Sequence, residues 1–327
     1  MQLISLHPCA DECDPADPAC DPTPCNVGVP TARRPFQGVI GADVLAGDAV
    51  RLRIGDDQLF VLADIGGTDQ GRSLACDAVF DSPFRGGGTL VVSGTELPFG
   101  NRRITLQACL GPVPDADPAT PIPQGQRGAD ALLVMSTSIG ISIIDEAAYE
   151  RYRNAHVAAA PPPAASLPQD AVYLPSGLVN GRRAHLDALA LVAASTSNAL
   201  APCRQVYAHH FLAVRDCIPS DADCPCAVGD VFCNVPAIVE LQPPAGIAVL
   251  IVDDDTNTLQ ALRTELRPDQ PEVDGILGTD ALRMLELDVD YPNARVLQRC
   301  TADRSICSAR PELFDGDRVQ VNGCIGG

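Results

Sequence analysis

Three hydroxyl side chains, Ser136, Thr137 and Ser138, follow directly after the strongly apolar run Ala131–Met135. A serine acts as a nucleophile only when a neighbouring base activates it, and no Gly-x-Ser-x-Gly elbow surrounds Ser136. Asp64 also follows an apolar run and would supply a carboxylate, although Asp-x-Gly-Gly is ordinary turn chemistry. The two candidate chemistries are therefore hydroxyl or carboxylate chemistry at the end of a strand.

Cysteines form a second group of reactive side chains. The chain holds 14, an even number, and their spacing lacks the paired Cys-x2-Cys knuckles of zinc ribbons. We therefore predict disulfides rather than a metal site. Cys76 and Cys109 bracket one β unit with no other cysteine near them in sequence, so we predict that they pair. Outside the N-terminal segment the disulfide candidates are Cys76, Cys109, Cys203, Cys217, Cys224, Cys226, Cys233, Cys300, Cys307 and Cys324.

Disulfides persist in oxidising compartments, so the cysteines predict an extracytoplasmic protein that is periplasmic, surface-bound or secreted. The first nine residues, Met1–Cys9, contain neither the basic start nor the apolar run of a secretory signal. Two explanations stay open. Either the sequence is a mature or truncated form, or the protein is cytosolic with free thiols.

Composition excludes several classes of function. The formal net charge is −19 and all 23 basic residues are arginine, so the field of the protein repels nucleic acid and anionic membranes. Without lysine there is no lysine nucleophile and no phosphate-gripping lysine. The 46% hydrophobic content is too high for a disordered chain, and no apolar run reaches the roughly 18 residues of a membrane span. We expect no cofactor.

The elements that must position these side chains are mainly short strands, with few helices. Asp145 is a predicted helix N-cap, and a second helix is predicted over 256–266. The predicted organisation is a Cys/Pro/Asp-rich segment (1–35), a partial first β lobe (36–110), a Pro-rich connector (111–128), a second lobe (129–300) and a Cys-containing tail (301–327).

One segment of the sequence is repeated. Residues 38–54, GVIGADVLAGDAVRLRI, parallel residues 275–291, GILGTDALRMLELDVDY, over 17 positions. Both copies begin with Gly-apolar-apolar-Gly-x-Asp-x-Leu and continue through a short helical turn into an alternating strand. In each copy the aspartate, Asp43 or Asp280, is predicted to cap the short helix.

The second copy resembles the hydrophobic-hydrophobic-glycine segment of retropepsin-like and pepsin-like aspartic proteases. Upstream, LLVMSTSIGISIIDEAAYERY resembles the strand, active-site loop, strand and helix of one lobe of that family. The resemblance covers roughly residues 89–300. It implies a mainly β, aspartic-protease-like (acid protease) barrel with a few short helices, here rich in disulfides.

The resemblance also implies that the catalytic chemistry is lost. The family places an aspartate before Thr/Ser-Gly at the end of the apolar strand, whereas this chain has Ser136, Thr137 and Ser138 there. Two carboxylates that share a proton activate water in that mechanism, and a serine cannot act as this general base. We expect a catalytically degenerate protein with a binding or structural role, whose partner would be a peptide or protein.

Two alternatives remain. An active aspartic peptidase would need carboxylates from an upstream segment, a second subunit or Asp64; the first copy of the repeat resembles the tail of a lobe whose front half would lie upstream. A secreted protein could instead use the barrel only as a scaffold. The sequence leaves the oligomeric state open.

Overall fold

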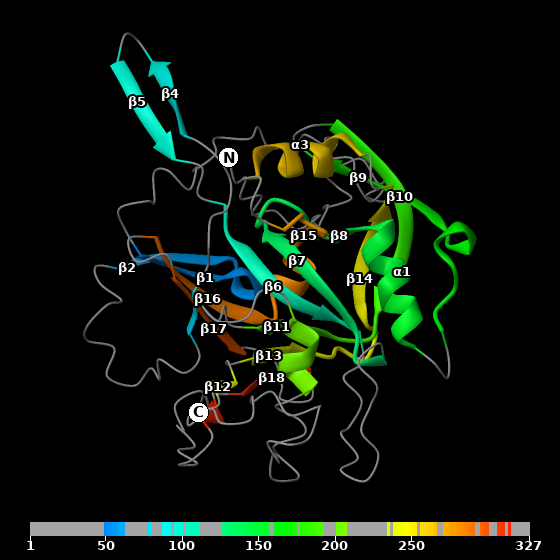
Figure 1. Cartoon of the computed structure of the whole chain (residues 1–327). Coiled ribbons are helices and arrows are strands. Elements are labelled where there is room, and N and C mark those ends of the chain that lie inside the picture. The colour runs from blue at the N-terminus through cyan, green and yellow to red at the C-terminus, as the bar shows by residue number, and fades with distance from the viewer. Residues whose placement is uncertain are drawn as a thin grey trace, which may run out of the picture.

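The computed structural model of the chain is drawn in Figure 1. It describes residues 49–62, 77–79, 87–92, 95–100, 103–111, 126–156, 160–174, 177–192, 201–207, 234–235, 238–253, 256–266, 271–291, 295–300, 306–310 and 313–314.

Most described elements are strands, which confirms the predicted mainly β class. The strands are β1 (Ala49–Arg53), β2 (Gln58–Leu62), β3 (Asp77–Val79), β4 (Gly87–Val92), β5 (Thr95–Gly100), β6 (Thr105–Leu110), β7 (Ala129–Met135), β8 (Ser142–Asp145), β9 (Gln169–Leu174), β10 (Gly177–Leu186), β11 (Leu189–Val192), β12 (Asn234–Val235), β13 (Ile238–Leu241), β14 (Ile247–Val252), β15 (Gly275–Leu277), β16 (Leu285–Asp290), β17 (Arg295–Cys300), β18 (Cys307–Arg310) and β19 (Leu313–Phe314). The labelled α-helices are α1 (Glu146–Ala155), α3 (Asn257–Glu265) and α4 (Thr279–Leu282).

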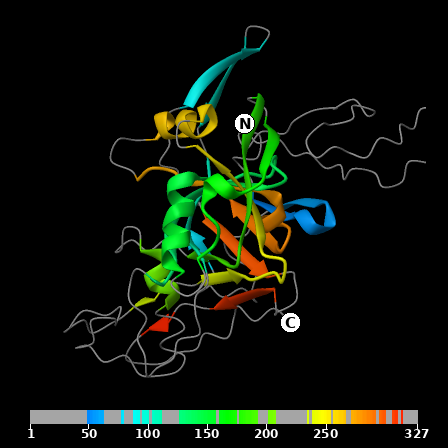
Figure 2. The ribbon, with the colours of Figure 1, turned by 90° about the vertical axis from the view of Figure 1, so that its right-hand side faces the viewer.

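Two large sheets carry the structure. The larger has ten strands in the order β18-β13-β11-β6-β7-β15-β8-β14-β10-β9, and the smaller has five in the order β2-β1-β16-β17-β3. Both orders have two ends, so the pairings among the described strands do not close a barrel. The β4–β5 hairpin pairs only within itself among these strands, and it projects from the body in both views (Figures 1 and 2).

The middle of the ten-stranded sheet has a crossed connection. Strands β7 and β8 are successive in the chain, yet β15 lies between them, parallel to β7 and antiparallel to β8. Because β15 runs parallel to β7, the chain leaves both strands at the same end of the sheet. The segments that follow them, Ser136–Ile141 and Gly278 with α4, must therefore meet there.

The repeat found in the sequence meets itself in the five-stranded sheet. Arg51 pairs with Asp288, its equivalent 237 positions later, and β1 runs antiparallel to β16 through this pair. The two hairpins share the same register too, since Arg53 faces Gln58 in one and Asp290 faces Arg295 in the other. The strands β2-β1 and β16-β17 are thus related by a local two-fold axis at Arg51–Asp288.

Residues of both sheets and of α1 form the main apolar core. Tyr149 and Tyr152 of α1 are fully buried beside β7 and β8, and Leu287 and Val289 of β16 belong to the same apolar cluster. Asp145 is the N-cap of α1, as predicted, and its carboxylate accepts the Ala148 N–H at 2.6 Å. The predicted second helix is confirmed as α3.

Pairing between strands also links segments on either side of the predicted boundaries. The Pro-rich connector 111–128 separates β6 from β7 in sequence, but these strands pair along their whole length, from Thr105–Val134 to Leu110–Ala129. Likewise β1, from the predicted first lobe, joins β16 of the second.

Candidate functional site

The segment Ser136–Ser138 is fixed at the end of β7 by the neighbouring β15. The Ser136 N–H donates to the Leu277 carbonyl at 2.9 Å, so Ser136 begins its loop directly beside the point where β15 ends. Ser136 and Thr137 are buried, with 9% and 6% of their surfaces exposed, and Ser138 is partly exposed. The predicted loop thus lies where the chain crosses β15.

The two crossing loops hydrogen-bond to each other through their backbones. Thr279 N–H donates to the Ile139 carbonyl at 2.8 Å, and Asp280 N–H donates to the Gly140 carbonyl at 3.1 Å. Gly278 N–H donates to the Ser142 hydroxyl at 3.0 Å. A Cβ on Gly278 would lie 2.6 Å from the Ile141 carbonyl, so only glycine fits this crossing without a shift.

The serine hydroxyls at the loop interact with each other. Ser136 Oγ lies 2.9 Å from Ser138 Oγ and accepts a long hydrogen bond from the Ser138 N–H at 3.4 Å. Thr137 Oγ1 is buried and has no hydrogen-bond partner among the described residues. Hydroxyls can orient a ligand, but they cannot serve as a general base near neutral or acidic pH.

Asp280 brings a carboxylate to this crossing. The Ser142 hydroxyl donates to Asp280 Oδ1 at 3.0 Å, while Oδ2 is buried without a partner. Burial raises the pKa of this carboxyl above its ordinary value. The prediction that Asp280 caps the short helix is wrong: the N-cap of α4 is Gly278, and Asp280 lies in the first turn with its side chain turned to Ser142.

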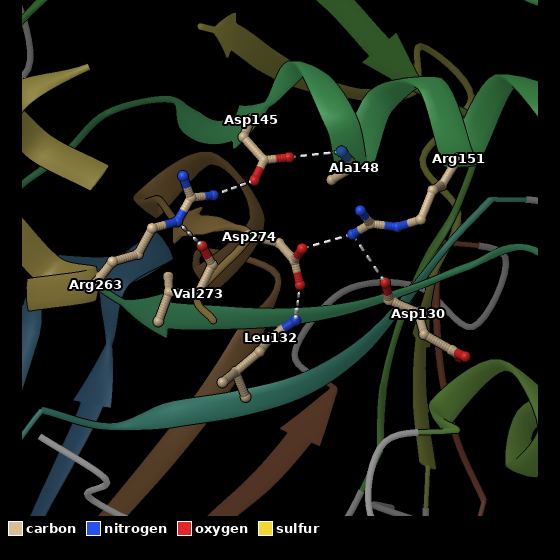
Figure 3. Close-up of polar contacts among 8 residues, drawn as sticks. All are labelled: Asp130, Leu132, Asp145, Ala148, Arg151, Arg263, Val273 and Asp274. Atoms are coloured by element: carbon tan, nitrogen blue, oxygen red, sulfur yellow. Dashed lines mark hydrogen bonds and ion pairs between the residues drawn. The ribbon is translucent and has the colours of Figure 1, made fainter. Parts of the chain in front are cut away.

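A second polar cluster fixes the elements that carry the loops, and sequence reasoning missed most of it (Figure 3). Asp274 Oδ2 accepts the Leu132 N–H at 2.7 Å, and Oδ1 pairs with Arg151 of α1. Asp145 pairs with Arg263 of α3, whose Nε also donates to the Val273 carbonyl. Asp274 directly precedes the Gly-Ile-Leu-Gly segment, and that position is the one sequence signal that could have indicated it.

The β9–β10 hairpin packs beside the loop. Leu174 of this hairpin shares an apolar cluster with Ile139 and Ile141, which follow the hydroxyl residues. Tyr173 and Leu178 face each other across the hairpin and are each half-exposed. An apolar pair is therefore available to solvent on the hairpin that packs against the loop.

The predicted pairing of Cys76 with Cys109 is wrong. Cys109 forms a disulfide with Cys203, 94 positions later in the chain. The sheet explains this choice: Cys109 faces Asp130 across β6 and β7, and the Asp130 carboxylate accepts the Cys203 N–H at 2.8 Å. Proximity in sequence was a poor guide because the helical residues 202–207 lie beside the end of β6 that carries Cys109.

Cys300 and Cys307 form the second described disulfide. Two such bonds are typical of an oxidising, extracytoplasmic location. The other candidates, namely Cys76, Cys217, Cys224, Cys226, Cys233 and Cys324, lie outside the described residues, as does Asp64. Over the described part of the chain there is no cluster of side chains suited to a metal ion, and no helix long and apolar enough to cross a membrane.

Neither a protein-family model nor a curated protein matches this chain by sequence.

Proposed function

We propose that this protein is a catalytically inactive relative of the aspartic proteases that binds an extended peptide or protein segment outside the cytoplasm. The observation that carries the proposal is the pair of serine hydroxyls, Ser136 and Ser138, which hydrogen-bond to each other at the end of β7. The aspartic-protease mechanism requires a carboxylate there, and a serine cannot replace it.

The connection around the loop supports the family assignment within this proposal. An apolar strand leads into the loop, a second strand ending in Leu277-Gly278 is inserted beside it, and a short helix follows. This is the order of parts that the sequence resemblance implies. The Asp280 carboxylate does not replace the missing group, since its described hydrogen bonds hold it to Ser142 rather than to Ser136.

A binding role is supported by the β9–β10 hairpin. Tyr173 and Leu178 form a solvent-exposed apolar pair on a hairpin whose neighbouring residues pack against the loop. Apolar pairs on an exposed hairpin suit contacts with an apolar side chain of a bound segment. The burial of Ser136 and Thr137 favours the second candidate, a protein that uses the fold only as a scaffold.

Cleavage and binding assays separate these functions. We expect no cleavage of a mixed peptide library between about pH 2 and 5, the range in which the paired carboxylates of pepsin-like proteases titrate. Cleavage that a transition-state-mimic inhibitor of aspartic proteases abolishes would contradict the proposal and support an active peptidase with carboxylates from Asp64 or another subunit.

The binding arm uses fluorescence anisotropy of labelled apolar peptides. We expect binding that Tyr173→Ser with Leu178→Ser weakens by about tenfold or more, whereas Val172→Ala, a partly buried neighbour, leaves it nearly unchanged. An absence of binding to any peptide of the library would contradict the binding role and favour the scaffold.

A further inference from the structure

The five-stranded sheet is asymmetric about its own local two-fold axis. The axis relates β2 to β17 and β1 to β16, which leaves β3 without a counterpart. On the β17 side, β3 pairs antiparallel with residues Arg295–Leu297. On the β2 side, no strand among the described residues occupies the position equivalent to β3.

Two features that protect natural sheet edges from pairing, charge and proline, are absent within the edge strand β2. Its sequence, Gln58-Leu-Phe-Val-Leu62, contains no charged residue and no proline. Exposed edges normally carry charges, proline or bulges that prevent strand addition. Here Phe60 and Val61 are instead 42% and 58% exposed. The strand is therefore suited to accept another strand.

The repeat shows that an apolar surface is uncovered on β2. Val61 corresponds to Gln298, 237 positions later, and Gln298 is only 3% exposed. A polar side chain is thus buried on one side of the axis, while an apolar side chain is exposed on the other. Burying apolar surface is favourable, so a strand added at this edge is expected to cover Val61.

The charged side chains of the neighbouring strand β1 are paired within the chain, whereas the exposed Asp56 and Asp57 precede β2. Arg51 forms a bidentate pair with Asp288, at 2.8 and 3.1 Å, and Arg53 pairs with Glu286 at 2.5 Å. The occupant of this edge should therefore be uncharged and apolar along its strand. Although the chain has a formal net charge of −19, the five residues of β2 are uncharged and mostly apolar. The β2 strand of a second copy therefore meets this description.

We propose that β2 pairs antiparallel with β2 of a second copy of this chain, forming a two-fold dimer with one continuous sheet. A register centred on Phe60 pairs all five residues: Phe60 faces Phe60 of the second copy, Val61 faces Leu59, and Gln58 faces Leu62. Directly opposed side chains lie about 5 Å apart in such a pair, so Val61 is covered by Leu59. The contact is self-complementary and closes, as stable homodimers require. It does not depend on the proposed function.

The test measures the mass of the full chain by sedimentation equilibrium between about 1 and 100 µM, under non-reducing conditions. We expect a dimer that Val61→Lys weakens at least about tenfold, because a charge on the edge opposes strand addition. Leu178→Lys is the matched control, since Leu178 is an equally apolar exposed strand residue on the β9–β10 hairpin. It should leave the dimer unchanged.

Hydrogen exchange of the unmodified chain gives a readout that does not depend on how a variant folds. We expect exchange at residues 58–62 to slow as the protein concentration rises, while exchange at residues 173–178 does not change. A chain that is monomeric over the whole concentration range overturns the proposal. So does a dimer that Leu178→Lys disrupts and Val61→Lys does not.

Discussion

At the level of single residues, the protonation of the Asp280 carboxyl should affect the stability of the crossing between the two loops. This carboxyl is largely buried, one oxygen accepts a hydrogen bond from the Ser142 hydroxyl, and the other oxygen has no partner among the described residues. Burial raises its pKa, so the native state holds this proton more tightly than the unfolded state does. The native structure therefore favours the protonated form of the Asp280 carboxyl, which lies at the crossing of the loops.

We therefore predict a pH effect for Asp280→Asn. For a carboxyl with a raised native pKa, stability is fully present below the unfolded pKa of about 4 and falls as pH rises to the native pKa. The variant lacks this loss, so its free energy of unfolding should increase relative to that of the unmodified protein across this window. Urea unfolding measured from pH 3.5 to 7 checks this. A constant difference between the two proteins would contradict it.

Single residues also show where sequence reasoning succeeded. Asp145 was predicted as an N-cap because a short acidic side chain preceded a helical pattern, and that rule is local. Asp274 and Arg151 form an ion pair across 123 positions of sequence, and no local pattern predicts which arginine a given aspartate meets. The prediction that Asp280 caps the short helix is wrong for the same reason: its side chain accepts a hydrogen bond from Ser142, 138 positions away in the sequence.

At the level of elements, Gly278 determines how closely the two loops cross. A methyl group there would lie 2.6 Å from the Ile141 carbonyl, which is backbone and cannot rotate away. We predict that Gly278→Ala lowers the free energy of unfolding by about 1–3 kcal/mol, the usual cost of overpacking. Denaturant unfolding monitored by circular dichroism checks this.

Gly140 in the opposite loop is the matched control, since a Cβ there would contact nothing within 4 Å. Gly140→Ala should change the free energy of unfolding by less than about 1 kcal/mol. Equal losses in both variants would show that the close approach at Gly278 is not what limits the substitution.

Elements were predictable from sequence wherever a period was visible. The strands β1, β7 and β14 coincide with apolar or alternating runs in the sequence. Helix α3 ends at Glu265, shortly before Pro268. The order of strands in the ten-stranded sheet was not predictable in the same way. It depends on which strand is inserted between β7 and β8, and that choice is made by packing over more than 130 positions of sequence.

At the scale of the whole molecule, the two described disulfides join different elements: Cys109–Cys203 links β6 to the helical residues 202–207, and Cys300–Cys307 links β17 of the five-stranded sheet to β18 of the ten-stranded sheet. Cys109–Cys203 spans 94 positions and Cys300–Cys307 spans 7. Non-reducing peptide mapping should recover a Cys109–Cys203 crosslink, and a Cys76–Cys109 crosslink would contradict the structure.

Stability measurements should separate the two bonds. Cross-links that close longer loops restrict the unfolded chain more, so replacing Cys109 and Cys203 by alanine should cost about 2–5 kcal/mol of unfolding free energy. The same change at Cys300 and Cys307 should cost less, and chemical denaturation of both variants gives the comparison.

The pairing of the repeat with itself has a consequence for how the molecule folds. The contact between Arg51 and Asp288 joins positions 237 residues apart, so forming β1–β16 requires closure of most of the chain into one loop. Closing so long a loop costs the chain conformational entropy before the strand pairing can stabilise it, and topologies rich in such distant contacts fold slowly. The hairpin β1–β2 is therefore expected to dock late, after the ten-stranded sheet has assembled.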